Sequence, residues 1–428
     1  MRFHNFEIDE KAFQLRENGQ PIKLERIPME LLLLLARNHT RLVTRDEIVA
    51  SIWGVNHFLE SESAINTAIR KLRRALKDNA AQPRIIETVP GKGYRFIAHT
   101  NTNHAGQRIA PPNPDALKSF LRGRHFWNKK TPDAYGKAIA YFQEAIDHDA
   151  AFAPAHVGLA HCYLLFGIHG LKPATDVMPL ARAAAHAALE IDPTSAEAAT
   201  VLADVSKGYD LNFALAEQQF QHALQLNPDY AVAHQWYANL LSVTGRHAQA
   251  AEQAGEARRC DPLSVGTSGF LGYTLYRAGR FDEALRACRQ TVGVHPNAPI
   301  AAWFLALVLI QMSRVQEADD CLTATLNAAN GSGIHISLLI FAKARNGHAA
   351  DAQALLQELQ QQSAQRYISP FDLGIAHLGL RERDSAIRCM RQAIDERVVR
   401  ATELPMPLFD EVRDDPQLAT FCDRLRAG

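Results

Sequence analysis

The stretch AINTAIRKLRRALKDN, residues 64–79, combines an apolar stripe with a dense positive charge. Its apolar residues recur at spacings of four, three and four, which places them on one side of a helix. They are Ile65, Ile69, Leu72 and Leu76. Five basic residues lie in the eight positions from Arg70 to Lys77, although the whole chain has no net charge. Three interpretations compete for this charge: an ordinary solvated face, a helix on a membrane surface, and a helix that contacts phosphate.

Short alternating segments precede this helix and predict a small sheet. Apolar and polar residues alternate in 3–8, 13–15 and 22–24, which is the pattern of strands that bury one face. Asn18-Gly19 lies between two of these segments, and this dipeptide favours a two-residue hairpin turn. The chain is therefore expected to begin with several short strands.

Two further helices are expected between these strands and the basic helix. Pro28 suits the first turn of a helix, and the apolar run after it predicts a buried helix that ends near Asn38. Thr44 is expected to cap the second helix, because Glu47 follows at the spacing of a capping box. Trp53, near the end of that helix, is expected to pack in the core.

A hairpin with a basic tip is expected after the basic helix. Residues 85–89 and 94–97 have the composition of strands, and the sequence PGKG (90–93) predicts a tight turn with Lys92 at its tip. Strands, three helices and a C-terminal hairpin in this order form a winged helix–turn–helix, an α+β fold whose third helix enters the major groove of DNA. The positive charge would then lie on the face of that helix that meets DNA.

Residues 1–98 resemble the DNA-binding domain of OmpR/PhoB-type regulators, in particular its ToxR/CadC-like and HilA-like relatives. The resemblance is carried by LVTRDEIVASIWG (42–54), AINTAIRKLRRALKD (64–78) and RIIETVPGKGYRFIA (84–98), in that order. Some relatives add a receiver domain and others a transmembrane helix, and neither is expected here.

The resemblance also implies which residues contact DNA. The outer face of the third helix reads or grips the groove, which implies this role for Asn66, Thr67, Arg70, Lys71 and Arg74. The start of the second helix and the wing hold phosphates, which implies that role for Thr44, Arg45, Lys92 and Arg95. Arg73 lies nearly perpendicular to the core stripe, so an ion pair within the domain and a DNA contact both remain open. The loop 54–61 is where family members contact RNA polymerase.

A repeat of about 34 residues runs through the remainder of the chain. Four prolines end successive units at spacings of 35, 34 and 34 residues: Pro193, Pro228, Pro262 and Pro296. Small residues before each proline let paired helices approach closely, and the proline ends the second helix. The helix-to-helix turns are expected at Gly245 and Gly279. The pattern resembles the tetratricopeptide repeat, an all-α solenoid whose concave face binds peptides or other domains.

Length and charge indicate a multidomain chain. A chain of 428 residues is too long for one compact core. Residues 1–100 hold 16 Lys and Arg against 12 Asp and Glu, a net charge of +4, so the remainder carries −4. The expected organisation is a winged helix–turn–helix domain in 1–99, a Pro-containing linker in 100–114, and a repeat array of about eight helical pairs in 115–428, with a longer loop near 168–178.

Cysteines and apolar runs bear on where the chain works. The six cysteines are dispersed and form no metal-binding or disulfide spacing, which is typical of a reduced interior. The longest apolar runs, 31–36 and 301–310, are shorter than the ~18–20 residues that a membrane helix needs. The chain is therefore expected to be cytoplasmic, without a membrane partner.

The sequence favours a soluble bacterial transcription regulator. It contains no signature of a nucleotide-binding loop, a zinc protease or a serine hydrolase, so no catalytic residue, metal site or cofactor is expected. The expected partner is double-stranded promoter DNA. RNA polymerase, a protein or small-molecule effector at the array, and a second copy of the chain are further candidates. The alternative is a scaffold protein whose winged helix binds proteins.

Overall fold

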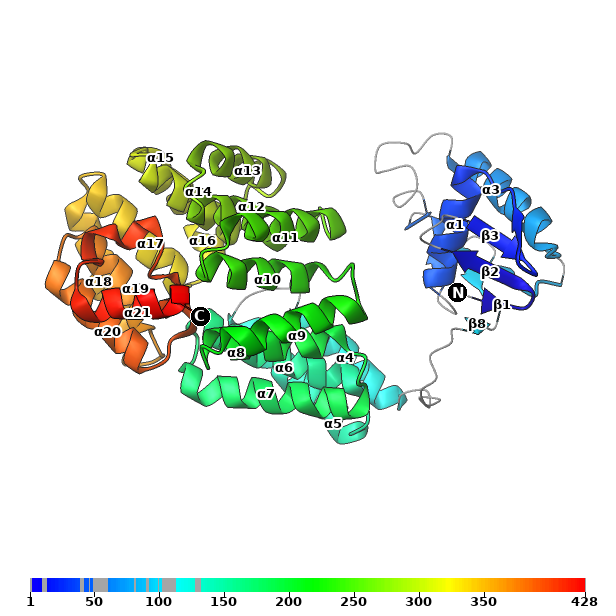
Figure 1. Cartoon of the computed structure of the whole chain (residues 1–428), viewed down its shortest axis with the longest axis horizontal. Helices are drawn as coiled ribbons and strands as arrows, with labels where there is room; N and C mark the ends of the chain where they lie inside the picture. Colours follow the sequence, from blue (N-terminus) through cyan, green and yellow to red (C-terminus); the bar gives the residue numbers. More distant parts are fainter. Residues whose placement is uncertain are drawn as a thin grey trace. The chain divides into compact units, whose positions relative to one another are not determined.

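The computed structural model describes residues 2–9, 14–38, 42–45, 47–48, 61–80, 82–89, 92–98, 100–101, 113–127 and 132–427. The chain divides into two compact units, Met1–Ile109 and Ala110–Gly428. The first unit combines strands and helices, and the second is built from helices (Figure 1).

An antiparallel sheet of five short strands opens the first unit. Its strands are β1 (Arg2–Phe3), β2 (Phe6–Asp9), β3 (Gln14–Glu17), β4 (Gln20–Ile22) and β8 (Thr100–Asn101), in the order β4-β3-β2-β1-β8. Asn18 and Gly19 join β3 to β4 with φ angles of 49° and 82°. A left-handed conformation at both central residues is what a type I′ turn requires. The hairpin predicted from Asn-Gly is confirmed.

Two helices and a second sheet complete the described part of this unit. They are α1 (Arg26–Arg37), α3 (Ser61–Leu76), β5 (Leu42–Thr44), β6 (Ile86–Val89) and β7 (Gly93–Phe96), with the strand order β5-β7-β6. The apolar stripe of α3 is buried, with Ile65 and Leu72 fully inaccessible. It shares a core with α1 and both sheets. The predicted core face of the basic helix is confirmed.

The first unit differs from the sequence expectation at two strands. Residues 42–44, of which only Thr44 has a predicted role as a helix cap, form the strand β5, because their backbone pairs with β7. Thr100 and Asn101 were assigned to the linker but pair with Arg2 and Phe3. Phe13, most of the second helix, Trp53 and almost all of the loop 54–61 lie outside the described residues.

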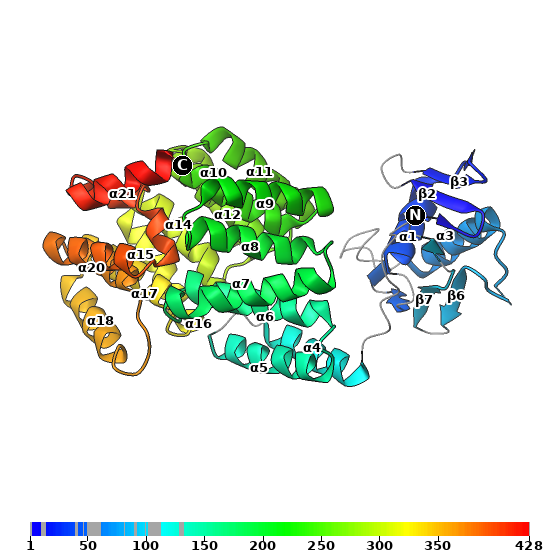
Figure 2. The ribbon, with the colours of Figure 1, turned by 60° about the horizontal axis from the view of Figure 1, so that its bottom comes forward.

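The helices of the second unit pack as eight successive pairs within the described residues. The first helices of the pairs are α4 (Pro114–Trp127), α6 (Ala153–Ile168), α8 (Ala196–Gly208), α10 (Ala231–Val243), α12 (Val265–Arg277), α14 (Pro299–Gln311), α17 (Gly333–Arg345) and α19 (Pro370–Gly379). The second helices are α5 (Pro132–His148), α7 (Ala174–Ile191), α9 (Phe213–Leu226), α11 (His247–Cys260), α13 (Phe281–Val294), α15 (Val315–Ala324), α18 (Ala349–Gln362) and α20 (Arg383–Asp395). Figure 2 shows the early pairs stacked in chain order.

The helix ends and turns of the repeats agree with the sequence prediction. Pro193, Pro228, Pro262 and Pro296 each follow the end of a second helix. Gly245 and Gly279 have positive φ angles of 79° and 73° in the turns between paired helices. Helices pack closely at Gly272, where a Cβ atom would lie 2.3 Å from the Cys288 sulfur. The loop expected near 168–178 is shorter than predicted, because α7 already begins at Ala174.

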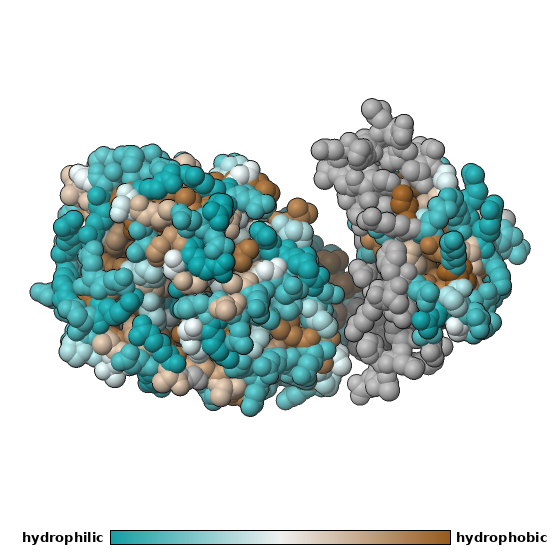
Figure 3. All heavy atoms as spheres, turned by 45° about the horizontal axis from the view of Figure 1, so that its top comes forward, coloured by the Kyte–Doolittle hydropathy of each residue, from teal (hydrophilic) through white to brown (hydrophobic). Residues whose placement is uncertain are grey.

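Three further elements follow the last pair. They are the 3-10 helices η1 (Val399–Glu403) and η2 (Pro407–Val412) and the helix α21 (Pro416–Ala427). Within the part of the chain that the structure describes, no helix is both long and apolar enough to cross a membrane. On the face of the second unit seen in Figure 3, hydrophilic residues predominate and apolar ones are scattered. The expected fold class, a winged helix–turn–helix followed by an all-α solenoid, is confirmed.

Candidate nucleic-acid interface

The exposed face of α3 presents a row of polar and basic side chains. Asn66, Arg70 and Arg74 lie on successive turns, and Thr67 and Lys71 lie beside them. All five are exposed. The buried stripe on the opposite side directs these side chains away from the core. The helix therefore offers the donors and positive charge that a DNA groove accepts.

Arg73 fixes α3 to the wing. Its guanidinium donates hydrogen bonds to the Ile86 carbonyl at 2.7 Å and to the Thr88 hydroxyl at 2.9 Å. Its Nε lies 3.9 Å from the buried carboxylate of Asp78, which also accepts the backbone N–H of Ile86 at 2.9 Å. Of the two roles left open for Arg73, the structure therefore shows the contact within the domain.

Asn66 is held by two donors from outside α3. The Tyr94 hydroxyl donates to Asn66 Oδ1 at 3.0 Å, and Arg45 Nη2 approaches the same oxygen at 3.3 Å. The Arg45 guanidinium also lies over the Tyr94 ring, 5.5 Å from its centroid. Arginine has no acceptor, so the amide atom that faces it must be the oxygen. The Asn66 oxygen is therefore engaged within the domain, and Nδ2 is the remaining polar group of this side chain.

Two of the predicted contact residues are engaged in surface ion pairs, of which that of Lys71 is exposed and that of Arg95 is half-buried. Lys71 Nζ lies 2.7 Å from the Glu25 carboxylate, and Arg95 Nη1 lies 2.9 Å from that of Glu87. Exposed ion pairs contribute little to stability, so a DNA phosphate can replace the carboxylate at small cost. The two cations are close to the interface and are partly neutralised in the free protein.

Three other cations are exposed at the interface. Within the described residues, no ion pair holds Arg70, Arg74 or Lys92. The Lys92 carbonyl accepts the backbone N–H of Arg45 at 3.2 Å, which ties the wing to the end of β5. An open hollow of about 550 Å³ runs along α3 and is lined by Asn66, Arg70, Arg74 and Tyr94, among others.

Thr44 has a structural function in the free protein. Its backbone N–H donates to Glu47 Oε2 at 2.8 Å, and its hydroxyl accepts the Glu47 N–H at 3.2 Å. The predicted capping box is confirmed, since both halves of the reciprocal bond are present. Contact of Thr44 with a phosphate remains a prediction.

Sequence reasoning missed the positioning residues of this interface. The sequence predicts only that Tyr94 lies in a strand, and it predicts no role for Glu25 and Asp78. Tyr94 carried a usable signal, because a buried tyrosine hydroxyl needs a polar partner. Within the described residues, no group of histidine, cysteine or carboxylate side chains could hold a metal ion.

Comparisons with known proteins match the two parts of the chain separately. Residues 19–96 match the family described as transcriptional regulatory protein, C terminal, and residues 271–330 match the tetratricopeptide repeat. The chain is 32% identical over 96 residues to the uncharacterized transcriptional regulatory protein YcbL of Bacillus subtilis. It is 37% identical over 94 residues to the transcriptional regulatory protein VxrB of Vibrio cholerae.

These matches cover only part of each protein. Each covers 22% of this chain, and they cover 42% of YcbL and 36% of VxrB, so the chain spans about two fifths of the length of these relatives. Among solved structures, the RstA DNA-binding domain of Klebsiella pneumoniae in complex with the RstA box is 30% identical to this chain. The match covers 97% of the RstA chain and 23% of this chain, with a TM-score of 0.22. Yeast Tom70 is 17% identical to this chain, and the match covers 84% of the Tom70 chain and 93% of this chain, with a TM-score of 0.47.

Proposed function

We propose, from an N-terminal OmpR/PhoB-type DNA-binding domain joined to tetratricopeptide repeats, that this chain is a sequence-specific transcription regulator. It would bind double-stranded promoter DNA through α3 and the wing. One observation carries the proposal: Arg70 and Arg74 are exposed on successive turns of α3, and no ion pair of the described residues holds them. A helix face of this kind suits the major groove.

The interface residues divide into two groups by chemistry. Asn66 and Thr67 lie in the N-terminal half of α3, where residues of a recognition helix reach base edges, and Arg70 lies one turn further along the same face. The remaining residues would position the domain on phosphates: Thr44, Arg45, Lys71, Arg74, Lys92 and Arg95. Asn66 would offer its amide N–H to an acceptor such as guanine O6 or thymine O4, because its oxygen is already engaged.

The repeat array would set the response of the regulator. Candidates for its ligand are a partner protein, a small-molecule effector and a second copy of the chain. A single winged helix buries little surface on DNA, so two copies on adjacent sites would raise the affinity without any new kind of contact. RNA polymerase is a further candidate partner, because a regulator that binds promoter DNA acts on transcription.

Crosslinking of the intact protein to genomic DNA, followed by sequencing, tests the proposal. The test variant is Arg70→Ala/Arg74→Ala. Its matched control is Arg258→Ala/Arg286→Ala, which removes the same charge from exposed helix positions in the array. We expect discrete peaks for the wild type and the control, and none for the test variant. Equal peaks for all three proteins would reject binding through Arg70 and Arg74. No enrichment for any of them would reject the proposal in favour of a protein-binding scaffold.

A further inference from the structure

Most residues of the segment that follows the last helical pair are buried, whereas Asp410 and Glu411 are exposed. Residues 398–412 form η1, η2 and the turn between them. Eight apolar side chains of this segment are at most 6% exposed: Val398, Val399, Ala401, Leu404, Met406, Leu408, Phe409 and Val412. They belong to the hydrophobic cores of the array. The segment therefore contributes to the same hydrophobic cores as the helices of the array.

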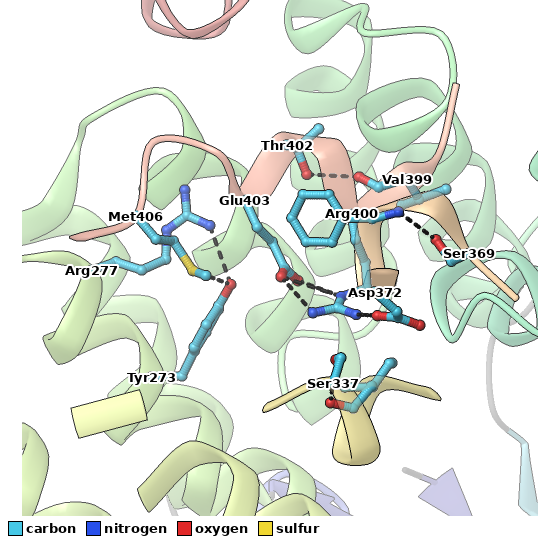
Figure 4. Close-up of polar contacts among 12 residues, drawn as sticks. Tyr273, Arg277, Ser337, Ser369, Asp372, Val399, Arg400, Thr402, Glu403 and Met406 are labelled. Carbon is cyan, nitrogen blue, oxygen red and sulfur yellow. Dashed lines mark hydrogen bonds and ion pairs between the residues drawn. The ribbon is translucent and has the colours of Figure 1, made fainter. Parts of the chain in front are cut away.

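The segment lies against first helices of pairs that are far away in the sequence. Val399 fills the space beside Gly208 of α8, where a Cβ atom would lie 2.6 Å from Val399 Cγ1. The Leu408 N–H donates to the Tyr276 hydroxyl of α12 at 3.2 Å. The Tyr273 hydroxyl donates to the Met406 sulfur (Figure 4). These contacts place the segment on the face of the array that the first helices form, and we call this the inner face.

Arg400 anchors the segment in a site built for a guanidinium group. Its guanidinium lies 5.6 Å from the Trp303 ring centroid and 5.0 Å from that of Phe371. Nη1 donates to Asp372 Oδ1 at 2.5 Å, and Glu403 lies 3.0 Å from Nη2 (Figure 4). The side chains of Arg400 and Asp372 are only 6% and 2% exposed. Aromatic faces and a fixed carboxylate together select arginine over lysine.

We propose that the inner face of the array is a binding groove for an apolar segment centred on an arginine, and that residues 398–412 of this chain occupy it. A core that needed only packing would gain as much or more from apolar residues, since burying an ion pair costs solvation free energy. The charge pair instead fixes the register of the segment, because one position alone satisfies the Asp372 carboxylate. A ligand in the same chain also has a high effective concentration, which excludes competing peptides from this face. Partners of the array are then left with its outer face and edges.

Amide hydrogen exchange of the full-length protein, followed by mass spectrometry, tests this proposal. In the wild type, we expect amides of 398–412 to exchange as slowly as those of α12 and α14. Arg400→Ala should speed exchange in the segment and in the facing turns of α12, α14 and α19 by at least about tenfold. Arg400→Lys, which keeps the charge but not the planar stacking, should lie between the two. Arg388→Ala, at an exposed position of α20, should leave exchange unchanged.

Two results would overturn the proposal. Exchange of 398–412 in the wild type at the rate of an unstructured peptide, while α12 and α14 stay protected, would show that the segment does not occupy the groove. Unchanged protection in Arg400→Ala would show that the guanidinium site does not hold it. The wild-type measurement decides the first point even if Arg400→Ala fails to fold.

Discussion

Asn66 illustrates how neighbouring residues would determine which base a proposed contact residue can recognise. Its oxygen accepts from Tyr94 and Arg45, so only its amide N–H is left for DNA. Tyr94→Phe removes one of these donors and lets the amide turn toward the bidentate pairing with adenine. We expect the base preference at the position contacted by Asn66 to broaden toward adenine. Sequencing of sites selected from randomised DNA measures this, and an unchanged profile would show that Tyr94 has no part in specificity.

Arg70 is the residue with the strongest expected base contact. Its alanine variant should lose about 1–3 kcal/mol of specific binding free energy and little of its binding to random DNA, because a base contact distinguishes sequences. Fluorescence anisotropy with both DNAs measures the difference. Equal affinity of Arg70→Ala and the wild type for the specific site would remove Arg70 from the interface.

Lys92 at the wing tip should behave differently. Lys92→Ala should weaken specific and random DNA alike and reduce the salt dependence of binding by about one unit of slope, since a phosphate carries no sequence information. A salt titration on both DNAs provides the measurement. Loss confined to one sequence would assign Lys92 to a base edge instead.

Periodicity revealed the candidate surface but not the partners of its residues. The stripe of α3 identified its opposite face, and Asn66, Thr67, Arg70, Lys71 and Arg74 are exposed there. The contacts of Lys71 with Glu25 and of Arg95 with Glu87 were not predictable. Spacing within one element determines which face a residue occupies, whereas these carboxylates come from other elements.

At the scale of elements, we expect the buried Asp372 to make the folding stability of the array depend on pH. Burial raises the pKa of Asp372 from its ordinary range to about 6, and the neighbouring Arg400 opposes this. Between about pH 4 and 6 the folded state then holds a proton that the unfolded state has lost. The contribution of Asp372 to stability is therefore greatest below pH 4 and is lost as the pH rises through 6.

The variant Asp372→Asn isolates this effect, because asparagine does not titrate. We expect the unfolding free energy of the wild type, relative to the variant, to fall as the pH rises from 4 to 7. Urea unfolding of both proteins, followed through tryptophan fluorescence, measures the difference. A difference that is constant with pH, or that grows as the pH rises, would contradict the raised pKa.

The helices of the repeats were predictable one by one. The packing of residues 398–412 against them was not. Each proline and turn glycine marks the end of a helix locally. The helix end near Pro228 and the turn at Gly245 could therefore be predicted from the sequence. The place of residues 398–412 depends on contacts with α8 and α12, more than a hundred residues earlier. The sequence therefore predicted a concave face that binds peptides, whereas the structure adds contacts of residues 398–412 with the first helices α8 and α12.

For the whole molecule, the division of charge follows the division of structure. The N-terminal hundred residues carry a net +4 and include the proposed DNA interface, whereas the remainder carries −4. A winged helix with a few phosphate contacts binds modestly alone. We therefore expect the array to contribute through its own partners, and not through contact with DNA.

The salt dependence of DNA binding by the intact protein tests the central claim most directly. The proposed interface contains six basic residues: Arg45, Arg70, Lys71, Arg74, Lys92 and Arg95. If they reach four or five phosphates, the logarithm of the binding constant should fall with the logarithm of salt concentration at a slope of about −4. The slope should become shallower in Arg70→Ala/Arg74→Ala but not in Arg258→Ala/Arg286→Ala. A flat salt dependence, or equal slopes for all three proteins, would contradict DNA binding through α3.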